Sequence, residues 1–105
     1  DLYSIYRVTL TPEAKRLVYH TRNIILESAK DNWEQVSKDS AAIEKIWSLF
    51  RNSLEEKQKK AGDKLNFSIY ELKKVVNSKA KQLTDIKGRI VLENIRELQK
   101  SIDEK

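Results

Sequence analysis

The residues that could carry out chemistry are few in this chain, and they lie far apart in the sequence. His20 is the single histidine, and there is no cysteine. A protein zinc site needs three or four ligands, so His20 could belong to such a site only beside carboxylates or a second chain. We therefore interpret His20 as a surface or boundary residue of a helix, and we expect neither a metal nor another cofactor.

Paired carboxylates and nucleophiles are also poorly placed for catalysis. Glu55 precedes Glu56, and Glu93 lies one helical turn before Glu97. Both pairs lie among lysines and arginines on polar helix faces, where water screens the charges and nothing favours acid–base chemistry. The two separated glycines cannot form a phosphate-binding loop, and no serine has a histidine at a motif-like spacing. The sequence therefore predicts a protein that is not an enzyme and has no small-molecule substrate.

Basic residues are the next candidates, because 21 of them against 16 acidic residues give a formal net charge of +5. The segment 73–89 is rich in them, and through them the chain could bind nucleic acid or an anionic membrane surface. The candidates are Lys73, Lys74, Lys81, Lys87 and Arg89. At 100° per residue, Lys87 and Arg89 point about 160° apart, so the cations do not share a face. Electrostatic binding is our second hypothesis, after a solvated face that keeps the domain soluble.

Large apolar side chains make the segment 33–54 the stronger candidate for a binding function. They recur at alternating spacings of three and four, which predicts one buried helix face that includes Trp47 and Phe50. Ile46 and Leu49 form a second apolar edge beside that face. A helix packed between two other helices would bury both edges. A helix in a two-helix hairpin would leave the second edge exposed for a partner. Ile46 and Leu49 are therefore candidate partner-binding residues.

The first ten residues, DLYSIYRVTL, predict an extended apolar arm, because β-branched and aromatic residues alternate loosely along them. A threonine, a proline and a glutamate at 11–13 are consecutive helix-start signals, so the arm cannot simply extend the following helix. We favour an arm that packs Tyr3, Ile5 and Tyr6 against the helices. In the alternative, these side chains stay exposed and bind another chain.

Amphipathic spacing predicts the helices that must position these side chains. The first helix should run from about residue 12 to 30, and the apolar phase favours a turn near 30–32, where Asp31 and Glu34 could form a capping box. One continuous helix over residues 12–60 is the alternative, and its exposed surface would need a partner chain. We expect the second helix to end near residue 60.

Glycines and a capping residue define the predicted end of the second helix and the start of the third. Lysines in its last turn and Gly62 in a left-handed conformation would close the second helix. Asn66 would cap a long third helix over residues 67–103, with Leu83 and Ile90 on its apolar side. Gly88 marks a kink, a close contact or a break in this helix.

The predicted fold class is all-α, an up-down-up bundle of three helices with a long third helix, in one domain over residues 11–105 that follows the arm of residues 1–10. A long antiparallel helical hairpin that dimerises is the alternative. No apolar run reaches the roughly 18 residues of a membrane span, and the first residues do not resemble a signal peptide, so we expect a soluble, intracellular protein. Because the chain begins with Asp1, we expect an excised domain or a processed product.

The function that best fits this pattern is a helical interaction or scaffold module within a larger protein. It would bind a protein partner, or associate with itself, through a groove or face of its helices. Salt should distinguish this hypothesis from electrostatic binding. Affinity for nucleic acid falls steeply as the salt concentration rises, whereas the affinity of an apolar groove for its partner changes little.

Overall fold

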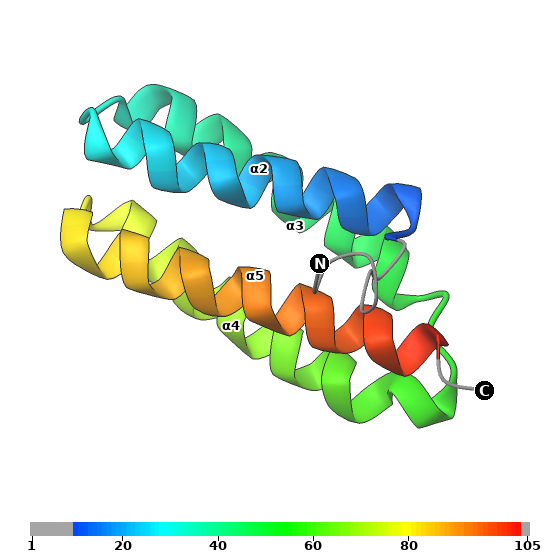
Figure 1. The fold of residues 1–105 in the computed structure, drawn as a ribbon. Coiled ribbons are helices and arrows are strands. Elements are labelled where there is room, and N and C mark those ends of the chain that lie inside the picture. The colour runs from blue at the N-terminus through cyan, green and yellow to red at the C-terminus, as the bar shows by residue number, and fades with distance from the viewer. Residues whose placement is uncertain (1–9, 104–105) are drawn as a thin grey trace, which may run out of the picture.

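Four α-helices follow one another along the part of the chain that the computed structural model describes, residues 10–103 (Figure 1). They are α2 (Pro12–Ala29), α3 (Trp33–Arg51), α4 (Lys59–Asn77) and α5 (Lys81–Asp103), with the short 3-10 helix η1 (Glu56–Gln58) before α4. This part of the chain is all-helical, as predicted, but it contains one helix more than the predicted bundle of three. Residues 1–9, most of the predicted arm with Tyr3, Ile5 and Tyr6, lie outside the described residues.

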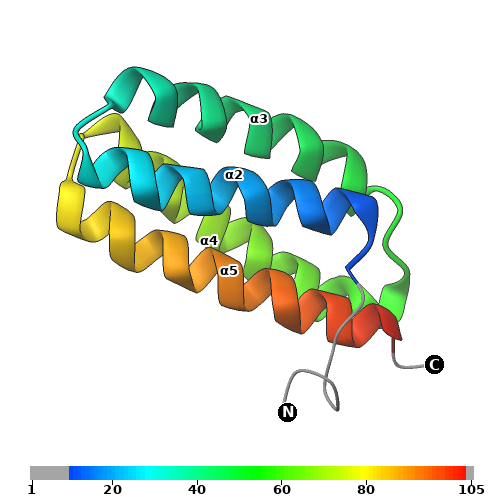
Figure 2. The same cartoon turned by 45° about the horizontal axis from the view of Figure 1, so that its top comes forward.

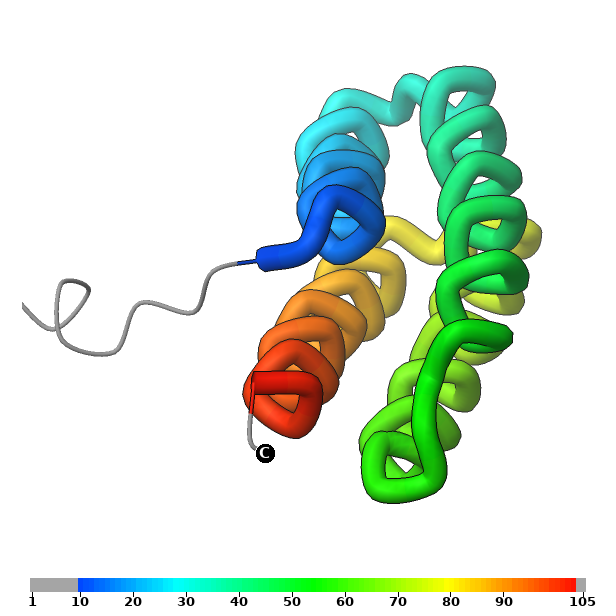
Figure 3. Tube along the Cα trace, turned by 90° about the vertical axis from the view of Figure 1, so that its right-hand side faces the viewer, coloured from blue at the N-terminus to red at the C-terminus, as the bar shows by residue number. Residues whose placement is uncertain are grey.

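The helices alternate in direction and form two hairpins that pack on one another (Figure 2). The first hairpin is α2 with α3, and the second is α4 with α5. In the end-on view of Figure 3, α2 lies above α5 on one side, and α3 lies above α4 on the other. The two hairpins contact each other mainly through α2 and α5, whereas α3 and α4 contact each other least among neighbouring helices. No helix within residues 10–103 is long and apolar enough to cross a bilayer.

The start of α2 confirms the first predicted boundary. The Oγ1 atom of Thr11 accepts a hydrogen bond from the backbone N–H of Ala14 at 3.2 Å, which satisfies a free donor of the first turn. Pro12 occupies the first helical position, where its missing N–H costs nothing. At the same boundary, the backbone N–H of Thr11 donates to Oε1 of Gln99 at 3.0 Å, so α5 also holds the start of α2 in place.

The turn predicted near residues 30–32 is confirmed as well, and it excludes a single helix over residues 12–60. Asp31 adopts a positive φ of 61°, a conformation that aspartate tolerates better than most residues. The helix cap is Asn32 rather than the predicted Asp31, since its side chain accepts from the backbone N–H of Gln35 at 3.5 Å. Asn32 also donates to Glu27 at 2.8 Å, which ties the two ends of the turn together.

The second helix ends earlier than predicted, and the next one begins earlier. After α3 ends at Arg51, a capping box starts η1: the backbone N–H of Glu55 donates to Oε1 of Gln58 at 2.7 Å. The lysines at 57, 59 and 60 therefore lie at the start of the next helix and not in the last turn of the previous one. A lysine-rich stretch fits a helix interior and a helix end equally well, which is why it misled the prediction.

The predicted roles of Gly62 and Asn66 at helix ends are wrong, because both residues lie inside α4. No glycine within residues 10–103 has a positive φ. Gly62 packs closely against Leu54, since a Cβ atom there would lie 2.8 Å from Cδ1 of Leu54, the movable end of a side chain. Asn66 uses its side chain to bind α3, as described below.

The single helix predicted over residues 67–103 is also wrong. The chain turns at residues 78–80, where Lys79 has a positive φ of 53°, and α5 then starts in a new helical phase. As a result, Leu83 and Ile90 are exposed and do not lie on the buried side. Gly88 lies within the continuous helix α5, where its Cβ would be 2.8 Å from Cγ1 of Ile25 in α2. A close contact was one of the three roles that the sequence left open for Gly88.

The core lies between the two hairpins and receives side chains from all four helices. Trp47 and Phe50 are buried in it, as predicted, with their rings edge to face at a centroid distance of 6.0 Å. The most deeply buried aliphatic side chains are Leu17, Ile24, Val36, Ile43, Leu65, Leu72, Val91, Ile95 and Leu98.

Candidate functional site

A groove of about 580 Å³ lies between α3 and α4, the two neighbouring helices that contact each other least. It is more apolar than polar at its surface. From α3 it is lined by Glu44, Trp47, Ser48 and Arg51, and from α4 by Asn66, Phe67, Ile69, Tyr70, Lys73, Lys74 and Asn77. We call this feature the α3/α4 groove.

The base of the α3/α4 groove is held by hydrogen bonds between the two helices. The indole Nε1–H of Trp47 donates to Oδ1 of Asn66 at 2.9 Å, and the guanidinium of Arg51 donates to the same oxygen at 3.0 Å. Arg51 also lies 6.0 Å from the centroid of the Trp47 ring, within reach of a cation–π attraction. These contacts satisfy the buried indole N–H and fix the tryptophan as a rigid wall of the groove.

Exposed aromatic rings line the α4 side of the groove. Phe67 and Tyr70 expose 64% and 57% of their surfaces, which is unusual for large apolar side chains. Lys74 lies 5.6 Å from the Tyr70 ring centroid, and Lys73 forms a 2.9 Å ion pair with Glu44 across the two helices. Phe67, Tyr70 and Lys74 are spaced by three and four residues and so share one helix face. This spacing was a signal for the edge in the sequence, and the prediction missed it.

The electrostatics of the α3/α4 groove favour an anionic or partly acidic occupant. Three cations, Arg51, Lys73 and Lys74, line it against one carboxylate, Glu44. Lys73 is engaged by Glu44 at 2.9 Å and Lys74 more loosely by Glu71 at 3.9 Å, so the charges of Arg51 and Lys74 are the ones that a ligand would meet most readily. Its lining combines large apolar side chains with amide, hydroxyl and charged groups.

The partner-binding residues proposed from the sequence do not gather in this groove. Ile46 is partly buried and packs against the core. Leu49 is exposed by 69%, but it lies about 160° from Trp47 around α3 and therefore faces away from the groove. With Tyr3, Ile5 and Tyr6 outside the described residues, these five side chains do not form one described site.

The candidate electrostatic residues are spread over two helices, and each forms an ion pair. The pairs are Lys73 with Glu44 at 2.9 Å, Lys74 with Glu71 at 3.9 Å, Lys81 with Asp31 at 3.3 Å, Lys87 with Glu71 at 3.4 Å and Arg89 with Asp85 at 3.1 Å. Several of these pairs join neighbouring helices of the bundle. The turn at residues 78–80 folds α5 back on α4, so that Lys74 of α4 and Lys87 of α5 pair with the same carboxylate, Glu71.

His20 forms part of a polar cluster between α2 and α3. Its Nδ1 lies 2.8 Å from Oδ1 of the buried Asp39, which also accepts hydrogen bonds from Asn23 at 2.8 Å and Gln35 at 3.2 Å. These three contacts satisfy most of the hydrogen-bonding capacity of the carboxylate. No group of three or more histidine, cysteine or acidic residues within residues 10–103 could hold a metal ion.

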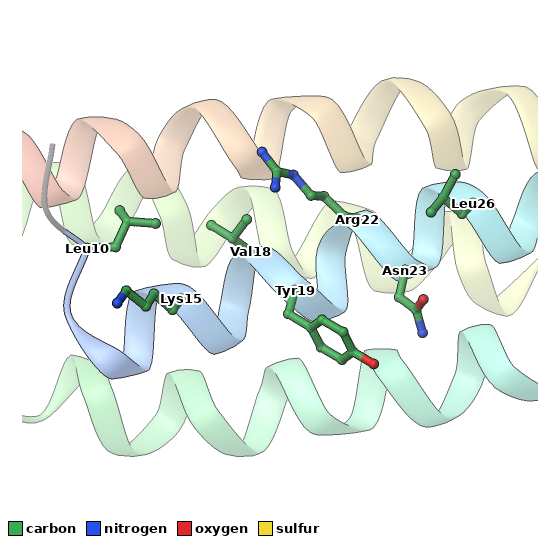
Figure 4. A pocket seen from close by; sticks show the side chains of 7 residues that line it. All are labelled: Leu10, Lys15, Val18, Tyr19, Arg22, Asn23 and Leu26. Carbon is green, nitrogen blue, oxygen red and sulfur yellow. The ribbon is translucent and has the colours of Figure 1, made fainter. Parts of the chain in front are cut away.

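A second hollow lies along the outer side of α2 (Figure 4). Its lining residues are Leu10, Lys15, Val18, Tyr19, Arg22, Asn23 and Leu26. In Figure 4, Arg22 extends towards α5 while Tyr19 points to the side of α3. Tyr19 and Leu26 are exposed, but the hollow is formed by a single helix and one preceding residue, so it lacks the two walls of the α3/α4 groove.

No known protein family, no curated protein and no solved structure matches this chain.

Proposed function

We propose that this chain is a non-enzymatic helical interaction module that binds a helical segment of a protein partner in the α3/α4 groove. The observation that supports this proposal most is the combination of an open groove of about 580 Å³ with the exposed rings of Phe67 and Tyr70. Large apolar side chains on the surface of a folded domain mark interaction sites when they are grouped and surrounded by polar residues. In this role, the chain would act as an adaptor or scaffold domain.

The dimensions of the groove suit a short helix. Its α4 wall extends from Asn66 to Asn77, which corresponds to roughly 16 Å at 1.5 Å per residue. A partner helix of about three turns would fill this length and would present apolar residues at spacings of three and four. Trp47, Phe67 and Tyr70 would contact those residues, and large rigid rings of this kind provide most of the affinity at many interfaces.

The charge of the groove defines the partner further. Arg51 and Lys74 lie beside the aromatic walls, so we expect acidic residues on the flanks of the partner helix. These contacts at the rim would mainly set orientation and association rate, while the aromatic contacts would set the lifetime of the complex. The rival hypothesis, electrostatic binding through Lys73, Lys74, Lys81, Lys87 and Arg89, is less favoured because their ion pairs already offset much of their charge.

A displayed library of random peptides of about 15 residues tests the proposal, because this length covers about four helical turns. Selection on the full chain should enrich peptides with apolar residues three and four apart and with acidic flanks. Tyr70→Ala and Phe67→Ala should each weaken binding of an enriched peptide by about tenfold. Leu49→Ala is the matched control, since Leu49 is equally exposed but faces away from the groove.

Two results would contradict the proposed function. The first is that selection enriches no peptide above background. The second is that enriched peptides bind the Tyr70→Ala, Phe67→Ala and Leu49→Ala variants equally well. A steep loss of affinity with added salt would instead support the electrostatic hypothesis.

A further inference from the structure

A second apolar surface lies on the outer side of α5 and extends to α4 beside the α3/α4 groove, with which it shares Phe67. Leu83, Ile86 and Ile90 of α5 are all exposed, although each is a large aliphatic residue. Their spacing of three and four places them on one side of the helix. Leu83 and Ile90 became exposed because the turn at residues 78–80 resets the helical phase. None of these three residues lines the α3/α4 groove, so a function of this surface would not depend on peptide binding in the groove.

The register between α4 and α5 extends this surface onto α4. Lys64 forms a 3.2 Å ion pair with Glu97, and Glu71 forms one of 3.4 Å with Lys87, so the two antiparallel helices are aligned over this length. The same alignment places Phe67 at the level of Ile90, on the outward side of α4. We call the surface formed by Phe67, Leu83, Ile86 and Ile90 the α4/α5 apolar face.

Charged residues flank the α4/α5 apolar face in opposite signs. At the end near Phe67, α4 carries Lys60 and Lys64. At the same level, α5 carries Glu93 and Glu97. The basic side and the acidic side of the face thus lie next to each other, one on each helix.

This arrangement makes the face complementary to itself. If a second copy is rotated by a two-fold axis parallel to the helices, α4 of each copy lies on α5 of the other. The lysines of one copy then meet the glutamates of the other, and Phe67 meets the isoleucines. Closed two-fold symmetry requires this kind of reciprocal contact. We propose that the α4/α5 apolar face is a homodimer interface whose partner is a second copy of this chain.

The size of the face sets the strength of the dimer. Two helices side by side, about 30 Å long and together about 20 Å wide, offer on the order of 600 Å² per chain. A standard stable interface buries about 800 Å² per partner. We therefore expect a weak, reversible dimer with a dissociation constant of about 1–100 µM.

Sedimentation equilibrium of the full chain over a range of concentrations tests the proposal. The wild-type chain should change from monomer to dimer within the expected range. Ile86→Ser/Ile90→Ser should weaken association at least tenfold, roughly the loss expected for two exposed aliphatic contacts. Tyr19→Ser/Leu26→Ser is the matched control, since it removes two exposed apolar residues from α2 and should leave association unchanged.

Charge reversal provides a second, independent test. Lys60→Glu/Lys64→Glu makes the flanks of both helices acidic, and Glu93→Lys/Glu97→Lys makes both basic. Each variant alone should therefore associate at least tenfold more weakly than the wild type at low salt. When the two variants are mixed, opposite charges face each other again, and a heterodimer should form.

Several outcomes would overturn the proposal. A wild-type chain that remains monomeric at about 1 mM, well above the expected range, has no such interface. If the α2 control and the α5 variant weaken association equally, the association is nonspecific hydrophobic contact and does not use the α4/α5 apolar face. A mixture of the charge variants that stays monomeric would overturn the proposed pairing of α4 with α5. None of these outcomes depends on peptide binding. Failure of the dimer proposal would therefore not contradict the function proposed for the α3/α4 groove.

Discussion

The two seams on either side of α4 use the same helix in different ways. At the α3/α4 seam, where these helices contact each other least, a hydrogen bond from Trp47 to Asn66 joins them at the base of a groove. At the α4/α5 seam, the helices pack closely, and ion pairs such as Lys64–Glu97 bridge them beside exposed apolar residues. A concave seam can hold a helix, whereas a surface of two packed helices fits another surface of the same kind.

Helices with similar amphipathic patterns thus form a groove between α3 and α4 and an exposed apolar face on α4 and α5. Large rings at a helix contact increase the separation of the axes, because interaxial distance follows the size of the side chains between them. The Trp47 ring donates to Asn66 and lies 6.0 Å from the guanidinium of Arg51, which donates to the same oxygen of Asn66. The tryptophan that fills the core therefore also lines the groove.

The largest effect should come from removing that ring. Trp47→Ala should lower the free energy of unfolding by about 3–5 kcal/mol, because it leaves a cavity and unpairs Asn66. Leu49→Ala, on the exposed side of the same helix, should change stability by less than about 0.5 kcal/mol. Denaturant melts of the two variants measure both values. Equal stability of Trp47→Ala and the wild-type chain would show that the tryptophan is not part of the core.

Removing the polar anchor should have a smaller effect. Asn66→Ala leaves the buried indole N–H of Trp47 without its acceptor, which should cost about 1–3 kcal/mol of unfolding free energy. A change within error in a denaturant melt would indicate that water or another group replaces Asn66. Asn77→Ala is a suitable control, because Asn77 lines the same groove near the other end of α4.

Gly62→Ala should stabilise the protein by up to about 1 kcal/mol. Alanine favours the helix interior, and the atom that its Cβ would approach is Cδ1 of Leu54, the movable end of a side chain. The left-handed conformation expected from the sequence would have given the opposite sign. Thermal melting decides between the two, since a lower melting temperature would mean that Leu54 cannot move aside.

The smallest effect should follow substitution on the α4/α5 apolar face. At concentrations at which the chain is monomeric, Ile86→Ser/Ile90→Ser should change the unfolding free energy by about 0.5 kcal/mol or less for each residue, because both side chains are exposed. A loss of several kcal/mol in a denaturant melt would show that these isoleucines serve the protomer's own core and not an interface.

The comparison also separates what the sequence could predict from what it could not. The helical class, the start of α2 at Thr11, the turn near Asp31 and the burial of Trp47 all followed from strong local signals. Those signals were a capping threonine before a proline, a change in apolar phase, and an unbroken spacing of three and four.

The second half of the chain was harder to predict because its boundaries lack such signals. The turn at residues 78–80 uses a positive φ at Lys79, where neither glycine, asparagine nor proline marks it. Gly62, in contrast, resembled a helix end but serves close packing with Leu54. The groove could not be predicted either, because it depends on how far apart α3 and α4 lie, a tertiary quantity that periodicity does not contain.

An NMR titration with a peptide enriched from the library would show whether a partner binds in the α3/α4 groove. The indole N–H signal of Trp47 reports on the base of the groove, and that of Trp33, near the opposite end of α3, is an internal control. We expect the Trp47 signal and the amides around Tyr70 to shift with added peptide while the Trp33 signal stays in place. Saturable binding that leaves the Trp47 and Tyr70 signals unchanged, with shifts concentrated on α2 or α5, would contradict binding in the groove.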